Sequence, residues 1–207
     1  MTTGLHVKVA GVWQKIGTTP QTQFSALAVI THTGATTSVG SDGTRVHTWR
    51  ASGSLQVLRS GWAEVLVCGG GAGAMADAGG GGGVRFGWFW LTADPAPSNF
   101  SVTVGAGGGR NVDGGTSTLQ GILTVGGGWT QGEARGKGGG GGTAGYSGNG
   151  GGGAAGAGNP GPGYVWRGIE YGKGGKGGIT PTLPGQGGAN TDGAGLAGAV
   201  VICCANE

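Results

Sequence analysis

The run Ala199-Val200-Val201-Ile202-Cys203-Cys204 decides how this chain folds, because it follows residues 126–198, in which glycine dominates. A disordered glycine-rich tail would have no reason to end in an apolar segment. Six consecutive apolar residues predict a buried strand. We expect this strand to pair with residues 63–68, an apolar run of the same kind. The long glycine-rich region would then be tied at both ends to one β framework.

Composition by itself is ambiguous about whether the chain folds. Glycine occupies 57 of the 207 positions, and its runs do not keep the three-residue register of collagen. Such a glycine content is typical of disorder. Disordered chains, however, usually have high net charge and few aromatic residues. This chain has a net charge of only +3 and carries seven Trp, four Phe and three Tyr, so a folded protein is predicted.

The glycine-rich region is predicted to form packed, left-handed extended helices of the polyglycine-II type. Such a helix has three residues per turn and no internal hydrogen bonds. Its N–H and C=O groups must therefore be satisfied by neighbouring helices. Only glycine allows so close a lateral approach, since a Cβ would hold the helices apart. The three-residue spacing of Gly145, Gly148 and Gly151 agrees with this prediction.

Outside the glycine runs the sequence predicts strands and no convincing helix. The expected strands are residues 25–31, 44–49, 54–58, 63–68, 84–91, 100–104 and 119–125, with turns at 41–43 and 51–53. The predicted fold class is therefore all-β. It consists of a β-sandwich or jelly-roll-like framework with packed polyglycine-II helices in the glycine-rich region.

The first residues read as a separate element. Two β-rich runs flank residues 10–11 as in a small hairpin, which is too short to be stable alone and must dock on something. The candidate docking residues are Val7, Val9, Val12 and Trp13. The expected organisation is a docking segment and linker at 1–20 and a β framework at 21–207, with glycine-rich insertions at 68–198 and a closing strand at 199–204.

No catalytic, cofactor or metal site is predicted, and an enzyme is not expected. Residues 136–141 match the dinucleotide pattern G-x-G-x-x-G, but chance matches are expected at this glycine content and no helix follows. The three histidines show no ligand spacing, and no two carboxylates stand out as an acid–base pair. The scattered basic residues argue against nucleic acid. No run approaches the roughly 20 apolar residues of a membrane span.

The three cysteines, Cys68, Cys203 and Cys204, are predicted to be buried free thiols. Because Cys203 and Cys204 are adjacent in a strand, their side chains should point to opposite faces. The sequence does not decide whether Cys68 forms a disulfide with either of the other two cysteines.

Aromatic side chains are the candidate interaction residues. Some of those in the glycine-rich region should pack between helices, and others should lie at exposed loop tips as receptor contacts. These candidates are Trp129, Tyr146, Tyr164, Trp166 and Tyr171. A further aromatic cluster, at residues 88–90, is compatible with core packing and with an exposed interaction patch.

The order of these motifs resembles the glycine-rich domain of bacteriophage tail proteins. The resemblance covers residues 44–202. Its marks are a strand entering a glycine run at 65–71, followed by the segments 102–108, 115–119, 123–128 and 198–202. The leader at residues 7–13 resembles the start of minor tail proteins of phages infecting actinobacteria.

The resemblance implies a virion protein of the tail tip or tail fibre, synthesised in the host cytoplasm. It would bind a host-surface glycan or protein through loops on the glycine-rich scaffold and contact other tail proteins. Tail fibres are often trimeric, so a homo-oligomer is expected. Two alternatives stay open, namely a purely structural tail component without a receptor role and a glycine-rich cell-surface or matrix protein.

Overall fold

The computed structural model describes the greater part of the chain, namely residues 6–9, 12–15, 27–40, 42–74, 78–93, 98–130, 163–175, 180–189 and 193–205. Within these residues all regular structure is β and no helix occurs. The strands are β1 (His6–Val9), β2 (Val12–Lys15), β3 (Val29–Val39), β4 (Arg45–Arg59), β5 (Gly61–Cys68), β6 (Val84–Leu91), β7 (Ser98–Thr103), β8 (Ser117–Leu119), β9 (Leu123–Val125), β10 (Tyr164–Trp166), β11 (Ile169–Tyr171) and β12 (Ala199–Cys204). The predicted all-β class is confirmed.

Strands β1 and β2 form the N-terminal hairpin that the sequence predicts. They pair antiparallel, with Val9 opposite Val12. The side chains of the candidate docking residues Val7, Val9, Val12 and Trp13 lie outside the described part of the structure. Their docking role therefore stays a prediction.

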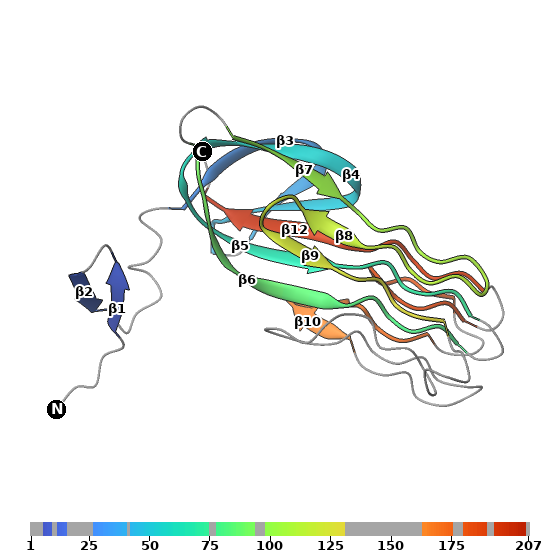
Figure 1. Cartoon of the computed structure of the whole chain (residues 1–207). Helices are drawn as coiled ribbons and strands as arrows, with labels where there is room; N and C mark the ends of the chain where they lie inside the picture. Colours follow the sequence, from blue (N-terminus) through green and yellow to red (C-terminus); the bar gives the residue numbers. More distant parts are fainter. Residues whose placement is uncertain are drawn as a thin grey trace.

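One antiparallel, nearly closed sheet forms the β framework, in the order β6-β5-β12-β4-β7-β8-β9 (Figure 1). Residues 45–49 of the long strand β4 pair with β12, and residues 53–57 pair with β7, while β3 runs along the other edge of β4. Strand β4 thus passes from one half of the sheet to the other. The two halves enclose the main core, which includes Trp49, Leu55, Val57, Val65, Val102, Leu119 and Ile202.

The closing strand β12 lies where the sequence predicts it, next to β5. Val200 pairs with Val67 of β5 on one side and with Trp49 of β4 on the other. All six residues of β12 are buried. Cys204 packs in the main core, whereas Cys203 packs in a second cluster on the outer side of the sheet, so the two thiols do face opposite ways.

Two local predictions were wrong, and one hairpin was missed. The turn expected at residues 51–53 is part of the continuous strand β4. Gly53 is needed there because a Cβ would collide with the carbonyl oxygen of Thr33 and approach the ring of Trp49. The single strand expected at 119–125 is two strands, β8 and β9, joined by a turn in which Gly121 has a φ of 71°. The hairpin of β10 and β11 was not predicted at all.

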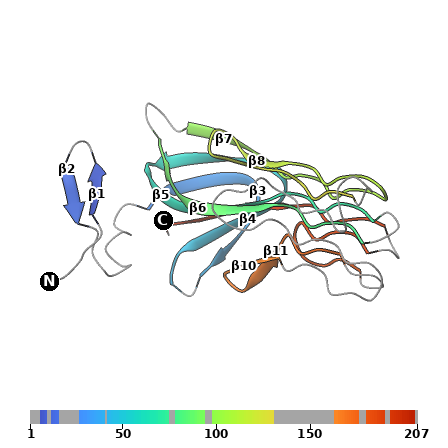
Figure 2. The same ribbon diagram turned by 60° about the horizontal axis from the view of Figure 1, so that its bottom comes forward.

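The glycine-rich segments leave one end of the β framework as extended chains that run side by side (Figures 1 and 2). We call this part the glycine bundle. It comprises residues 69–74, 78–83, 105–116, 126–130, 172–175, 180–189 and 193–198. These segments are not strands, and hydrogen bonds between them join residues far apart in the sequence.

Residues 69–74 lie at the centre of the glycine bundle, and their N–H groups donate in an order that repeats every three residues. The first and fourth N–H groups donate to segment 78–83, the second and fifth to residues 112–115, and the third and sixth to segment 193–196. The pairs are Gly69 to Gly83, Gly70 to Gly115, Gly71 to Leu196, Ala72 to Gly80, Gly73 to Val112 and Ala74 to Gly193, with N···O distances of 2.7–3.0 Å. Each neighbouring segment thus accepts a hydrogen bond from every third N–H group of residues 69–74.

The carbonyl groups of the central segment face three further neighbours. They accept hydrogen bonds from Gly128, Gly108, Gly188 and Asn111. Among the described residues, segment 69–74 is therefore bonded to six surrounding stretches of chain. A Cβ on Gly69, Gly70, Gly71 or Gly73 would lie within 3.0 Å of backbone atoms of these neighbours, a separation that real Cβ atoms essentially never show. Glycine is required here because of packing on all sides.

Candidate functional site at the distal end of the glycine bundle

A group of mostly exposed side chains lies at and beside the turn that residues 109–112 make in the glycine bundle. We call these residues the distal surface; they are Arg110, Asn111, Val112, Asp113, Trp129 and Thr130. Val112 is 54% exposed and Trp129 is 43% exposed. Because glycine has no side chain, the walls of the bundle offer few large groups for recognition. Outside the distal surface, the exposed side chains of the described bundle segments are Ala or Thr.

Backbone hydrogen bonds fix the turn that presents Val112. Its N–H donates to the carbonyl of Gly109 at 2.9 Å, which closes the turn. Asn111 has a φ of 62°, a left-handed conformation that Asn tolerates better than most residues. The N–H of Asn111 donates to the carbonyl of Ala74, at the end of the central segment, at 3.0 Å. The turn is therefore held by the centre of the bundle.

Asp113 connects this turn to the segment that carries Trp129. Its Oδ1 accepts hydrogen bonds from the N–H of Thr130 at 2.6 Å and from the Thr130 hydroxyl at 3.0 Å. Gly114 donates to the carbonyl of Gly128 at 2.9 Å, one residue before Trp129. Val112 and Trp129 are thus presented from neighbouring, mutually bonded segments.

The structure separates the five aromatic residues that the sequence singles out as contact candidates. Trp129 lies on the distal surface, and Tyr146 lies outside the described residues. Tyr164 is half-buried and stacks on Phe86, with ring centroids 4.7 Å apart. Trp166 and Tyr171 are buried in the second cluster, where they pack the hairpin of β10 and β11 against the sheet. Their burial gives them a packing role instead of a surface for a receptor.

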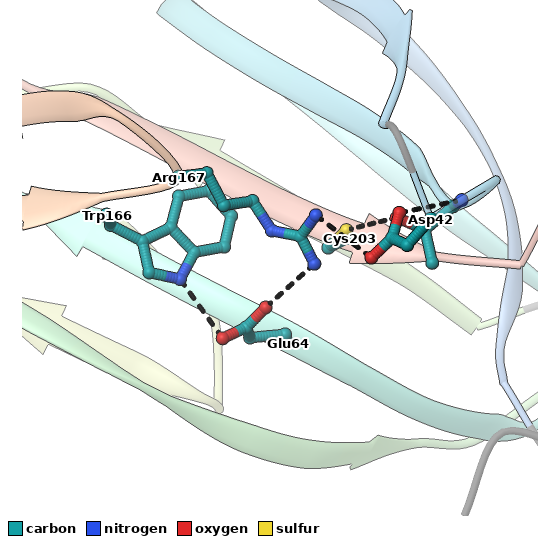
Figure 3. Close-up of polar contacts among 6 residues, drawn as sticks. Asp42, Glu64, Trp166, Arg167 and Cys203 are labelled. Carbon is teal, nitrogen blue, oxygen red and sulfur yellow. Dashed lines mark hydrogen bonds and ion pairs between the residues drawn. The ribbon is translucent and has the colours of Figure 1, made fainter. Parts of the chain in front are cut away.

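A network of charged groups fastens the β10–β11 hairpin to the framework (Figure 3). Arg167, in the hairpin turn, places Nη1 at 3.2 Å from Asp42 and Nη2 at 3.2 Å from Glu64. The indole Nε1–H of Trp166 donates to the other oxygen of Glu64 at 3.0 Å. A hydrogen bond from the Thr44 hydroxyl, assisted by Arg167, lowers the pKa of Asp42. Both carboxylate oxygens of Glu64 accept hydrogen bonds, one from Trp166 and one from Arg167. The network therefore holds the hairpin in place, and it contains no carboxylate that is free to act as an acid or a base.

The three cysteines are packed inside the fold. All three are buried free thiols, as predicted, and no disulfide joins Cys68 to Cys203 or Cys204. Burial raises the pKa of Cys68 to about 12, and burial also raises the pKa of Cys203. Only a thiolate is a good nucleophile or metal ligand, so neither thiol is prepared for chemistry at neutral pH.

The described residues contain no group of three or more His, Cys, Asp or Glu side chains placed to hold a metal ion. They also contain no helix of the length and apolarity that a membrane crossing requires.

Part of the distal surface was missed at the level of sequence. Residues 110–113 were not singled out, although they interrupt the glycines at 105–109 and 114–115 with two charged side chains. The sequence signal for this surface is the break that residues 110–113 make in the glycine run. It could not show that these residues share a surface with Trp129, because that depends on hydrogen bonds between segments.

No family model matches the chain, and no curated protein matches it significantly. The function is therefore argued from the geometry of the chain and from the order of its motifs.

Proposed function

We propose that this protein is a non-enzymatic structural protein of a bacteriophage tail, located at the tail tip or in a tail fibre. Its β framework holds the glycine bundle, and the distal surface binds a host-surface glycan or protein. Other tail proteins and further copies of the same chain are the proposed neighbours. The motif order of residues 44–202 is what favours a phage tail over other glycine-rich proteins.

The proposal includes the structure of the scaffold. We infer that the bundle segments are polyglycine-II helices and that the framework is a sandwich of the jelly-roll-like kind. The supporting observation is the three-residue order in which residues 69–74 donate to their neighbours, because a helix with three residues per turn returns to the same neighbour at every third residue. Segment 78–83 supports it too: Gly79 and Gly82 donate to residues 185–188, and Gly80 and Gly83 donate to residues 126–129.

One observation carries the receptor role. The exposed apolar side chains Val112 and Trp129 stand at the end of a scaffold whose own walls are mostly backbone. Rigid aromatic residues beside small, adaptable polar ones make good binding surfaces. A scaffold that is held by lateral hydrogen bonds keeps such residues ordered before binding, which reduces the entropy lost on association.

Trp129→Ala is expected to weaken binding of the purified, fluorescently labelled protein to host cells by about tenfold or more, because buried tryptophans dominate many interfaces. Val112→Ser should weaken binding as well. Val165→Ser is the matched control, since Val165 is 61% exposed and lies in the hairpin strand β10 instead of the distal surface. Binding is measured by flow cytometry on a panel of actinobacterial cells.

The receptor role is lost if the protein binds no cells of the panel and antibodies against it leave phage adsorption unchanged. Equal losses for Val112→Ser and Val165→Ser would also contradict it. A purely structural tail component would then be the remaining function.

A further inference from the structure

A second exposed surface lies on the framework, away from the distal surface. Trp62 of β5 and Trp88 and Trp90 of β6 are 42–49% exposed. We call them the tryptophan face. Trp62 pairs directly with Trp90 across the two strands, and their rings meet edge to face with centroids 5.6 Å apart. Trp88 pairs with Glu64. The four side chains thus form a two-by-two arrangement on one side of the sheet.

Strand alternation explains why these rings point outward. Ala63 and Leu91, next to Trp62 and Trp90 in the sequence, are buried in the main core, and Phe89 packs against it. Successive side chains of a strand face opposite sides. The aliphatic residues on the outer face of the same two strands, Leu66 and Val84, are buried in the second cluster. What this face exposes is therefore aromatic.

Fixed polar groups adjoin the rings. Glu64 is held by the indole of Trp166 and by Arg167, and Arg167 is held in turn by Asp42. The planar carboxylate of Glu64 is thus ordered opposite Trp88, and it holds the planar guanidinium of Arg167 next to it. Both groups are partly exposed, at 17% for the Glu64 side chain and 31% for the Arg167 side chain.

The size of the tryptophan face argues for a narrow ligand. Three half-exposed indoles offer roughly 300 Å² of surface. A stable protein–protein interface needs about 800 Å² on each partner. A sugar chain needs much less width, since each ring presents a face of C–H groups to the electron-rich face of an indole while its hydroxyls bond to planar polar side chains.

We propose that the tryptophan face binds a neutral polysaccharide, with pyranose rings stacked on Trp62, Trp88 and Trp90 and hydroxyls bonded to Glu64 and Arg167. The ligand is neutral and not acidic, because two carboxylates, Glu64 and Asp42, share the single guanidinium of Arg167 and would repel an anionic chain. This inference rests on the proposed function, to which it adds a chemical class of host-surface ligand and a second contact site.

The test is affinity electrophoresis of the full chain in gels that contain dextran, mannan or galactan. At least one polysaccharide should retard the protein, and Trp90→Ala or Trp62→Ala should raise its dissociation constant by about tenfold. Val39→Ser, which changes an exposed apolar side chain of β3 outside both surfaces, is the control and should leave the retardation unchanged. Trp129→Ala is measured beside it to separate the tryptophan face from the distal surface. Circular dichroism checks that each variant is folded, and sedimentation checks its oligomeric state.

Three results would overturn the inference. One is no retardation by any of the polysaccharides, and a second is retardation lost on Trp129→Ala but kept in the Trp62 and Trp90 variants. The third is a change of oligomeric state in Trp90→Ala with unchanged retardation, which would make the face a subunit interface. Cell binding that depends on Trp129 would survive the first and third results, so failure here is distinguishable from failure of the proposed function.

Discussion

Replacing Gly70 by alanine is expected to lower the free energy of unfolding by about 3 kcal/mol or more, the upper range for overpacked sites. A Cβ at this position would collide with the carbonyl of Ala106 and lie 2.9 Å from the carbonyl oxygen of Gly105. Both are backbone atoms. The neighbouring segment could move away only by weakening the bond from Gly115 to Ala106 and the bond from Gly70 to Gly115.

Gly126→Ala is the matched control, because Gly126 belongs to the same bundle but a Cβ there would meet no atom within 4 Å. This substitution should be neutral or should stabilise the fold by about 0.4–1 kcal/mol, since alanine reduces the entropy of the unfolded chain. Urea denaturation followed by circular dichroism measures both values. Equal effects of the two substitutions would mean that the segments do not approach one another as described.

Acidification from pH 7 to pH 4 is expected to cost about 3 kcal/mol of stability through His47 alone. This side chain is 3% exposed. Its Nδ1 lies 3.0 Å from the Thr37 hydroxyl, whereas its Nε2 is buried and has no partner among the described residues. Burial, and then the charges of His32 and Arg45, lower the pKa of His47 from 6.5 to about 4.

The sign of the effect follows from proton binding. Below pH 6.5 the unfolded chain takes up a proton on His47, whereas the folded protein does so only near pH 4. Between these values the unfolded state binds more protons, so stability falls as the pH falls. His47→Gln should flatten the stability curve between pH 7 and pH 4. His32→Gln should keep most of the slope, because burial is the main cause of the lowered pKa.

Urea denaturation at half-unit pH intervals measures these slopes. A flat wild-type curve over this range, or an unchanged slope in His47→Gln, would show that His47 is not buried in the strand pairing of β3, β4 and β12.

Continuous apolar runs allow both the type and the pairing of two strands to be predicted from sequence. The closing strand β12 and residues 65–68 of its partner β5 are buried on both sides, so their apolar runs indicate strands that lie next to each other. Gly53 shows the opposite case. Its sequence context favours a turn, but the reason for glycine there is a contact with Thr33, twenty residues away in the chain.

The irregular spacing of the glycines also has a physical reason. The central segment repeats every three residues, but it is bonded to neighbours on six sides, so almost every position faces a backbone. Glycine is then needed at four of the six positions of residues 69–74, unlike collagen, where one residue in three meets the crowded axis. The three-residue order of hydrogen bonds therefore leaves little trace in the sequence.

The candidate surfaces could be predicted only in part. Trp129 is a candidate from sequence because it is one of the aromatic residues that punctuate the glycine-rich region. Whether Trp88 and Trp90 face the core or solvent could not be predicted, because alternation shows that they share a face but not which face is covered. Trp62 joins them only through the register of β5 and β6.

The central claim is that the glycine segments form a folded bundle held by lateral hydrogen bonds. Native-state amide hydrogen exchange of residues 69–74, measured by NMR, tests it most directly. The claim predicts that these amides exchange as slowly as those of β5 and β12, with opening free energies near the global value. Exchange at the rate of an unfolded chain in residues 69–74, with slow exchange in β5 and β12, would contradict it.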